Sequence, residues 1–261
     1  MKAENKVHVD YLVVTVPITS LDSEVLNRFA SLTIEGDFRR IYGFAGFVKD
    51  RLFVGDNGKR LMVQATGSRA NEIVYLIEPS WQGLSVARLD LQVTVYVADA
   101  DSVIRSTNPP NMYKAMRVVN LNERGSTLYV GSPKSRIRLR LYNKTAEAGE
   151  ERTELGERLR IELQLRNDSA DRALINIHAG SGDMFYLYHV KRMTDAYISS
   201  IIERAFANST FRAMIETDTG KTVDTRKEWI EHSVIPALAK MSVLDSEYYK
   251  KLIERLKMFI E

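Results

Sequence analysis

The chain has 261 residues, of which 44% are hydrophobic and 27% charged, and a mildly basic net charge of +3; these values are typical of a globular protein, not a disordered or fibrous one. It contains no cysteine, which excludes disulfides, thiolate metal sites and cysteine catalysis. No apolar run approaches the roughly 18 residues of a membrane span, and the N-terminus lacks the pattern of a signal peptide. We therefore expect a cytoplasmic protein with no membrane partner.

The first part of the chain predicts short strands separated by glycine-containing turns. β-branched or alternating runs predict strands over residues 7–16, 61–65, 73–77 and 88–97. The second and third of these are expected to pair across a turn at Gly67. Residues 22–29 begin within a serine and aspartate cluster and are predicted to form a helix.

The later part of the chain changes from strands to helices. Strands are predicted over residues 127–130, 136–144 and 158–166, and helices over 193–216, 225–240 and 245–260. The pattern predicts an α+β fold, with a mostly antiparallel sheet, helices packed on it and a helical C-terminal third. We divide the chain into a β-rich region, 1–185, and a helical region, 186–261, packed as one compact unit.

The segment 136–144 alternates strictly between charged or polar and aliphatic residues. Successive side chains of a strand point to opposite faces. One face therefore carries Arg136, Arg138, Arg140, Tyr142 and Lys144, and the other carries Ile137, Leu139 and Leu141. Four cations and a tyrosine on one face indicate a surface that binds phosphates, with a hydroxyl group in reach of them.

Two further segments, 88–96 and 158–166, show the same alternation. If the three strands lie in one sheet, their aliphatic faces are buried together and their charged faces coincide. Asp90, Tyr142 and Glu162 then share a surface ringed by arginines. For a single strand, a solvated sheet face is the commoner explanation, but three strands with acids, amides, a tyrosine and cations favour a site.

Phosphoryl transfer is the chemistry that fits this surface. A tyrosine hydroxyl has an ordinary pKa of about 10, and we expect the neighbouring cations to lower it and favour the phenolate. Tyrosine is a known covalent nucleophile, and cations stabilise the charge that develops on phosphoryl oxygens. Carboxylates and amides offer oxygen ligands for Mg²⁺ or Mn²⁺. The product would be a phosphotyrosine link to DNA.

An acidic segment follows the basic strand. Residues 147–157 contain five glutamates and one arginine. The segment is expected to be a solvated loop or short helix, and its negative potential is suited to keeping a polyanion on one path.

The middle of the chain resembles the plasmid rolling-circle replication initiators of the Rep_trans family, of the staphylococcal-plasmid type. The resemblance lies in Gly125-Ser-Thr-Leu-Tyr-Val-Gly-Ser132, then Ser135, then Arg140-Leu-Tyr-Asn-Lys144. The segments Arg88-Leu-Asp90 and Arg160-Ile-Glu162, and Asp10-Tyr11 near the start, are similar as well. Where family members often carry further acids, this chain has Thr94 and Gln164.

The resemblance implies a relaxase-like, topoisomerase-like nicking and closing enzyme. Such proteins bind the double-strand origin, nick one strand through a 5′-phosphotyrosine link, recruit a host helicase, act as homodimers, use Mg²⁺ or Mn²⁺ and later rejoin the strand. The resemblance also implies that origin recognition lies in the C-terminal region. The residues expected to act are Tyr142, Arg140 and Lys144 in catalysis, Asp90 and Glu162 as metal ligands, and Arg136, Arg138, Arg88, Arg160 and Lys134 in DNA binding.

Several alternatives remain open on the sequence. Tyr129 is the rival nucleophile, although its apolar sequence neighbours favour a structural role. The four histidines lack the paired spacing of metal sites, but His8 is close enough to Asp10 to approach the sheet. A non-catalytic, origin-binding replication regulator and a phage or integrated-element initiator of the same superfamily are the competing functions.

Overall fold

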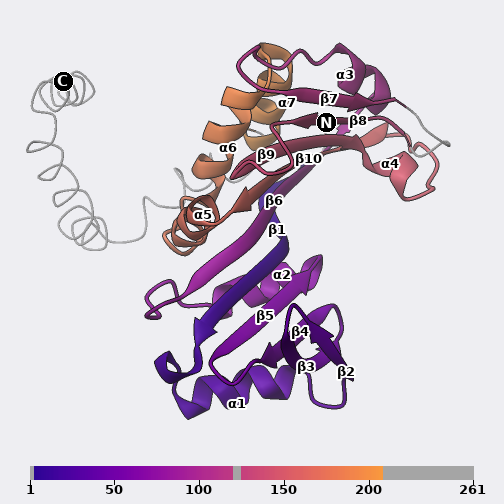
Figure 1. The fold of residues 1–261 in the computed structure, drawn as a ribbon. Coiled ribbons are helices and arrows are strands. Elements are labelled where there is room, and N and C mark those ends of the chain that lie inside the picture. The colour runs from indigo at the N-terminus through magenta and orange to yellow at the C-terminus, as the bar shows by residue number, and fades with distance from the viewer. Residues whose placement is uncertain (1–2, 120–124, 208–261) are drawn as a thin grey trace, which may run out of the picture. The chain divides into compact units, whose positions relative to one another are not determined.

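The computed structural model describes residues 3–119 and 125–207, which lie within one compact unit of residues 1–209 (Figure 1). All of the described strands form one ten-stranded antiparallel sheet in the order β2-β3-β4-β5-β1-β6-β10-β9-β8-β7. The α+β prediction, with a mostly antiparallel sheet and helices packed on it, is therefore confirmed.

Two long strands, β1 and β6, join the two ends of this sheet. The strands are β1 Ala3–Pro17, β2 Asp37–Ile41, β3 Phe44–Lys49, β4 Leu52–Asp56, β5 Arg60–Thr66, β6 Ser85–Val97, β7 Ala115–Val118, β8 Thr127–Val130, β9 Ile137–Asn143 and β10 Glu157–Arg166. Every pairing between them is antiparallel.

The helices pack mainly on one face of the sheet. They are α1 Ser23–Leu32, α2 Ser68–Ile73, α3 Ala100–Ser106, α4 Lys144–Glu147, α5 Asp168–His178, α6 Gly182–Met193 and α7 Ala196–Ala207, with 3₁₀ turns η1 Ile18–Ser20 and η2 Val74–Leu76. Helices α3, α5, α6 and α7 contact the central strands, and Figure 1 shows α5 and α6 beside β9 and β10.

The core forms where the aliphatic faces of the central strands meet these helices. Leu91 of β6, Leu139 of β9 and Leu163 of β10 are fully buried in one cluster. Removal of such side chains from water supplies roughly 25 cal/mol per Å² of apolar surface. The opposite faces of the same strands carry the charged and polar side chains.

Most of the predicted strands are confirmed, but residues 73–77 are not a strand. Ile73 ends α2, residues 74–76 form η2 and Ile77 follows it; Ile73, Val74 and Ile77 are buried in the core. A short apolar run fits a buried helix as well as a buried strand, so its periodicity does not distinguish them. Gly67 has φ +61, which ends β5 and allows α2 to begin at once.

The helical part begins earlier than predicted, at α5. The expected helix over 193–216 is instead the end of α6 followed by α7, because the chain breaks at Thr194 and Asp195 caps α7 through a bond from the Ile198 N–H to Oδ1 (3.0 Å). The part of that prediction beyond residue 207, and the predicted helices over 225–240 and 245–260, lie outside the described residues. The division at 185/186 falls inside α6 and stays a prediction.

Within residues 3–119 and 125–207, no helix is long and apolar enough to cross a membrane.

The Tyr186 hydroxyl ties α6 to the sheet by donating to the Ile161 carbonyl oxygen of β10 at 2.8 Å, where both atoms are buried. We expect Tyr186→Phe to lower the free energy of unfolding by about 1–2 kcal/mol, since the carbonyl loses this donor without access to water. Urea unfolding checks this. The control is Tyr188→Phe on the exposed side of α6, which should change little; equal effects would show that the buried bond adds nothing.

Candidate functional site

Cross-strand pairing brings the predicted site residues together on the polar face of β6, β10 and β9. The rows that cross these strands are Thr94–Arg160–Tyr142, Gln92–Glu162–Arg140 and Asp90–Gln164–Arg138. Side chains directly opposite each other in an antiparallel sheet lie about 5 Å apart at Cβ. The structure therefore places Asp90, Tyr142 and Glu162 on one surface among arginines, as the alternation predicts. We call this surface the polar face.

Asp90 is buried at 2% exposure, and Arg88 of the same strand holds it. The Arg88 guanidinium donates to both carboxylate oxygens, from Nε to Oδ1 at 2.9 Å and from Nη2 to Oδ2 at 2.5 Å. Burial nevertheless raises the pKa of Asp90 to about 7, since the loss of hydration outweighs the arginine and Glu162 adds a like charge. Near neutral pH this carboxyl is poised between its neutral and charged forms.

Glu162 lies in the adjacent strand and is equally buried. Gln164 Nε2 donates to its Oε1 at 2.7 Å, and Arg140 Nη1 lies 3.6 Å from its Oε2. In the next row, Arg160 Nε donates to the Thr94 hydroxyl oxygen at 3.1 Å. Thr94 and Gln164, at positions where the sequence resemblance suggests acids, thus belong to the same hydrogen-bonded surface.

Tyr142 is less accessible than its predicted role requires. Its side chain is 3% exposed, and the Arg140 guanidinium carbon lies 3.8 Å from its ring centroid. Burial raises the pKa of Tyr142 to about 12, although Arg160 and Arg140 act to lower it and Glu162 and Glu147 act to raise it further. The expectation that the cations lower this pKa is wrong for the free protein, because desolvation of the phenolate costs more than the arginines return.

Tyr129, the rival nucleophile, lies on β8 directly opposite Arg140. The Arg138 guanidinium carbon is 4.0 Å from its ring centroid and that of Arg140 is 6.0 Å away. Its neighbours in sequence are apolar, but its neighbours across the strands are cations. Arg140 therefore lies near two tyrosines, Tyr142 and Tyr129, and the half-buried Tyr129 is the more accessible of them.

The predicted row of cations on one face of segment 136–144, which we call the cationic stripe, is shorter in the structure than in the sequence. Arg136 precedes β9 and pairs with Asp168 in solvent at 2.7 Å, and Lys134 is exposed in the turn before it. Lys144 is the first residue of α4, not a strand residue, because the Asn143 side chain accepts from the Ala146 N–H (3.0 Å) and starts the helix. Arg138 and Arg140 are left as the strand's cations on the polar face.

The acidic segment neutralises part of this basic surface. Glu147 of α4 accepts from Lys144 Nζ at 2.5 Å and from Arg140 Nη2 at 3.4 Å, and Glu150 pairs with Arg158. Helix α4 ends at Glu147, and the rest of the acidic segment up to residue 156 is loop and turn, so the loop is the alternative that the structure confirms. Glu147 occupies the place beside Arg140 and Lys144 where a phosphate is expected. The sequence placed this glutamate only in a solvated acidic segment and did not predict its contacts with Arg140 and Lys144.

Three polar atoms on the polar face are buried without hydrogen-bond partners among the described residues. They are Arg138 Nε, Arg140 Nε and Gln92 Oε1. Such atoms cost about 1–3 kcal/mol each when unsatisfied, so their concentration at one place indicates a missing ligand. The two N–H groups suit an anion, and the carbonyl oxygen suits a cation.

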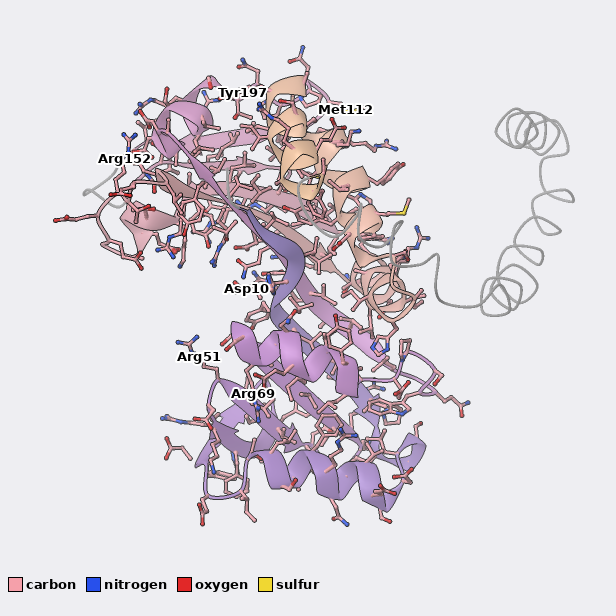
Figure 2. The ribbon with its side chains drawn as sticks, turned by 180° about the vertical axis from the view of Figure 1, so that it is seen from behind. Asp10, Arg51, Arg69, Met112, Arg152 and Tyr197 are labelled. Atoms are coloured by element: carbon pink, nitrogen blue, oxygen red, sulfur yellow. The ribbon has the colours of Figure 1, made fainter. Side chains whose placement is uncertain are left out.

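A β-bulge adds Asp10 to the site. The pairing of β1 with β6 shifts between Val9 and Tyr11, which leaves Asp10 as the extra residue. Its Oδ1 accepts from Gln92 Nε2 at 3.1 Å, and its carbonyl accepts from the Gly67 N–H at 2.7 Å. Asp10 is labelled in Figure 2. Strict alternation along the strand does not reveal such a bulge, although the resemblance at Asp10-Tyr11 is a signal for it. His8 is paired with Gln92 in the same sheet.

The residues of this site fit a divalent cation only as a partial set of ligands. No group of three or more His, Asp or Glu able to hold a metal occurs among the described residues. Asp90, Glu162 and the unsatisfied Gln92 oxygen are the hard oxygen donors that Mg²⁺ and Mn²⁺ prefer. Mg²⁺ is commonly held by one or two carboxylates together with water and substrate phosphate, which such a set allows.

Comparisons with known proteins agree with this fold. The solved structure of a rolling circle replication initiator protein from Geobacillus stearothermophilus aligns with a TM-score of 0.57 and 20% identity, over 73% of this chain and 86% of that chain. No curated protein matches the chain. The family model described as replication initiation factor matches residues 86–256, more than half of the chain and including β6, β9 and β10. The chain therefore belongs to the Rep_trans family of replication initiation factors.

Proposed function

We propose that this replication initiator starts rolling-circle replication of a plasmid by nicking one strand of the double-strand origin with Tyr142. The observation that carries the proposal is the position of Tyr142 beside Arg140, whose buried Nε–H has no hydrogen-bond partner among the described residues, and directly opposite Arg160 in the neighbouring strand. Two buried acids, Asp90 and Glu162, lie in the neighbouring strands of the same polar face.

The proposed reaction is a transesterification. The Tyr142 hydroxyl oxygen bonds to the phosphorus and loses its proton, while the bond to the 3′-oxygen breaks and that oxygen takes up a proton. The 5′-phosphate stays on the tyrosine, and the reverse reaction rejoins the strand. No net phosphate bond is lost, so the link stores the energy for closure.

The cations have separate roles in this proposal. Arg140 and Lys144 bind the reacting phosphate and stabilise the charge that develops on it, after the phosphate displaces Glu147. Contacts to neighbouring phosphates, which give affinity without sequence preference, come from Arg88, Arg136, Arg138, Arg160 and Lys134. Because burial keeps Tyr142 protonated in the free protein, DNA binding must precede its activation.

Asp90 and Glu162 are proposed to hold Mg²⁺ or Mn²⁺, with the side-chain oxygen Oε1 of Gln92 as a further metal ligand. Such an ion supplies charge stabilisation at a phosphoryl oxygen. The support is the unsatisfied Gln92 oxygen and the high pKa of the buried Asp90, both of which a cation would relieve. The homodimer and the host helicase remain predictions from the family resemblance.

A non-catalytic, origin-binding regulator is the second candidate. Thr94 and Gln164 stand where further acids are often found, and both are engaged in hydrogen bonds with the site residues Arg160 and Glu162. A protein of this kind would bind the origin and leave it intact in the presence of either metal.

The nucleophile is tested by Tyr142→Phe, which removes only the hydroxyl group. We expect origin binding to persist and the covalent protein–DNA adduct to fall by at least about a thousandfold, as when a nucleophile is deleted. The measurement is the adduct formed on supercoiled plasmid carrying the replicon's own origin, resolved in denaturing gels. Tyr129→Phe is the matched control and should retain the adduct. An undiminished adduct in Tyr142→Phe, lost in Tyr129→Phe, would move the nucleophile to β8.

The buried acid is tested by the pH dependence of stability. The pKa of Asp90 in the folded protein is about 7, above about 3.9 in an unfolded chain, so the folded state binds the extra proton between these values. The free energy of unfolding should therefore fall as pH rises from about 4 to about 7, by up to about 1.4 kcal/mol per unit. Asp90→Asn should flatten this slope in urea unfolding.

Two comparisons make that experiment decisive. Asp168→Asn, at an exposed pair with Arg136, should keep the wild-type slope. Added Mg²⁺ or Mn²⁺ should raise the melting temperature of the wild type above neutral pH, where Asp90 is charged, and should not do so in Asp90→Asn. The same slope in wild type and Asp90→Asn would show that another group titrates in this window.

A further inference from the structure

The turn between β2 and β3 lies close to the polar face, although it belongs to the other end of the sheet. Ile41 and Phe44, which flank this turn, pack together with Tyr11 on a buried apolar cluster of Val13, Phe53 and Met62. The turn residue Tyr42 also interacts electrostatically with Tyr11 and contributes to the raised pKa of Tyr11. The strands that carry the turn therefore curl back toward the polar face.

Two glycines allow this curl. Gly46 of β3 and Gly55 of β4 are paired across the strands, and a side chain at Gly46 would collide with the Val54 carbonyl oxygen and with Gly55 itself. Glycine in a strand often marks a site where another backbone approaches closely. The position of the turn is thus set by backbone packing and does not depend on Tyr42.

Tyr42 is exposed and conformationally costly. Its side chain is 83% exposed, and its φ of +51 lies in the left-handed region that disfavours bulky residues. Glycine, asparagine or aspartate is the usual residue at such a position of a two-residue hairpin turn. A tyrosine that adds nothing to the core and occupies a strained position is best explained by what its ring contacts outside the protein.

Arginine side chains lie between this turn and the Asp90 end of the polar face. Arg39 is exposed on the same face of β2 as Ile41, and exposed Arg51 lies against Gly67, whose N–H donates to the Asp10 carbonyl. Figure 2 labels Arg51 and Asp10. At the Asp90 end of the polar face, the Arg88 guanidinium carbon lies 4.5 Å from the ring centroid of Tyr11, and Arg88 holds Asp90.

We propose that the β2–β3 turn binds single-stranded DNA at the Asp90 end of the polar face, with the Tyr42 ring stacked on one base and Arg39 and Arg51 at the backbone. The inference rests on the proposed function for the strand that arrives at Tyr142. An exposed ring flanked by arginines is the usual platform for unpaired bases, since every base has a face to stack on. Base faces in a duplex are already stacked, so the turn selects the single strand. It lies outside the residues matched by the family model.

The experiment measures binding of the full chain to a fluorescent oligothymidylate of about 30 nucleotides by anisotropy, at low salt because the phosphate contacts are screened. Tyr42→Ala should weaken binding roughly tenfold, and Tyr42→Phe should bind like the wild type. Tyr197→Ala, at an exposed tyrosine of α7 labelled in Figure 2, is the matched control and should bind normally.

Tyr42→Asn separates the ring from folding. Asparagine tolerates the left-handed conformation, so this variant should melt at or above the wild-type temperature and still lose the roughly tenfold affinity. Wild-type affinity in Tyr42→Ala and Tyr42→Asn, or no binding of the oligothymidylate by the wild type, would overturn the inference even if Tyr142 nicks the origin. Tyr42-dependent binding without any nicking would instead overturn the proposed function and leave the single-strand site standing.

Discussion

Burial of one aliphatic face of β6, β10 and β9 beneath α3, α5, α6 and α7 is the constraint on which the rest of the structure depends. If the pairing register of any of these strands shifted by one residue, leucines such as Leu139 and Leu163 would point into the solvent and the charged side chains would point into the core. The register is therefore fixed by hydrophobic packing. The same register sets which charged residues meet on the polar face.

That arrangement desolvates ionisable side chains, and the neighbouring arginines offset the electrostatic cost only in part. Asp90 and Glu162 are buried and contacted by Arg88 and Arg140, yet the pKa of Asp90 is raised to about 7. Tyr142 is buried as well, and its pKa is raised instead of lowered. The buried charged groups of this surface have lost their hydration in the free protein, so a bound phosphate and cation would stabilise them strongly. Ligand binding and chemistry are therefore expected to be coupled at this site.

The N-terminal strands contribute to the same surface from a distance in sequence. The bulge in β1 places Asp10 beside Gln92, and the paired glycines of β3 and β4 let the β2–β3 turn approach Tyr11. Both features act through backbone geometry, and only the Asp10-Tyr11 segment also carries a resemblance to the family. They extend the polar face from the proposed nicking tyrosine toward the exposed ring of Tyr42.

The sequence by itself determined the alternation of the three central strands, and with it the α+β class and the shared face of Asp90, Tyr142 and Glu162, because a period of two leaves only one face to bury. It also carried the motif by which the family is recognised. Only the tertiary structure decided the length of the cationic stripe, the pairing of Glu147 with Arg140, the cationic surroundings of Tyr129 and the direction of the Tyr142 pKa. Those depend on cross-strand neighbours, a helix cap, a bulge and desolvation, which arise from contacts between residues far apart in the chain and leave no periodic signal within it.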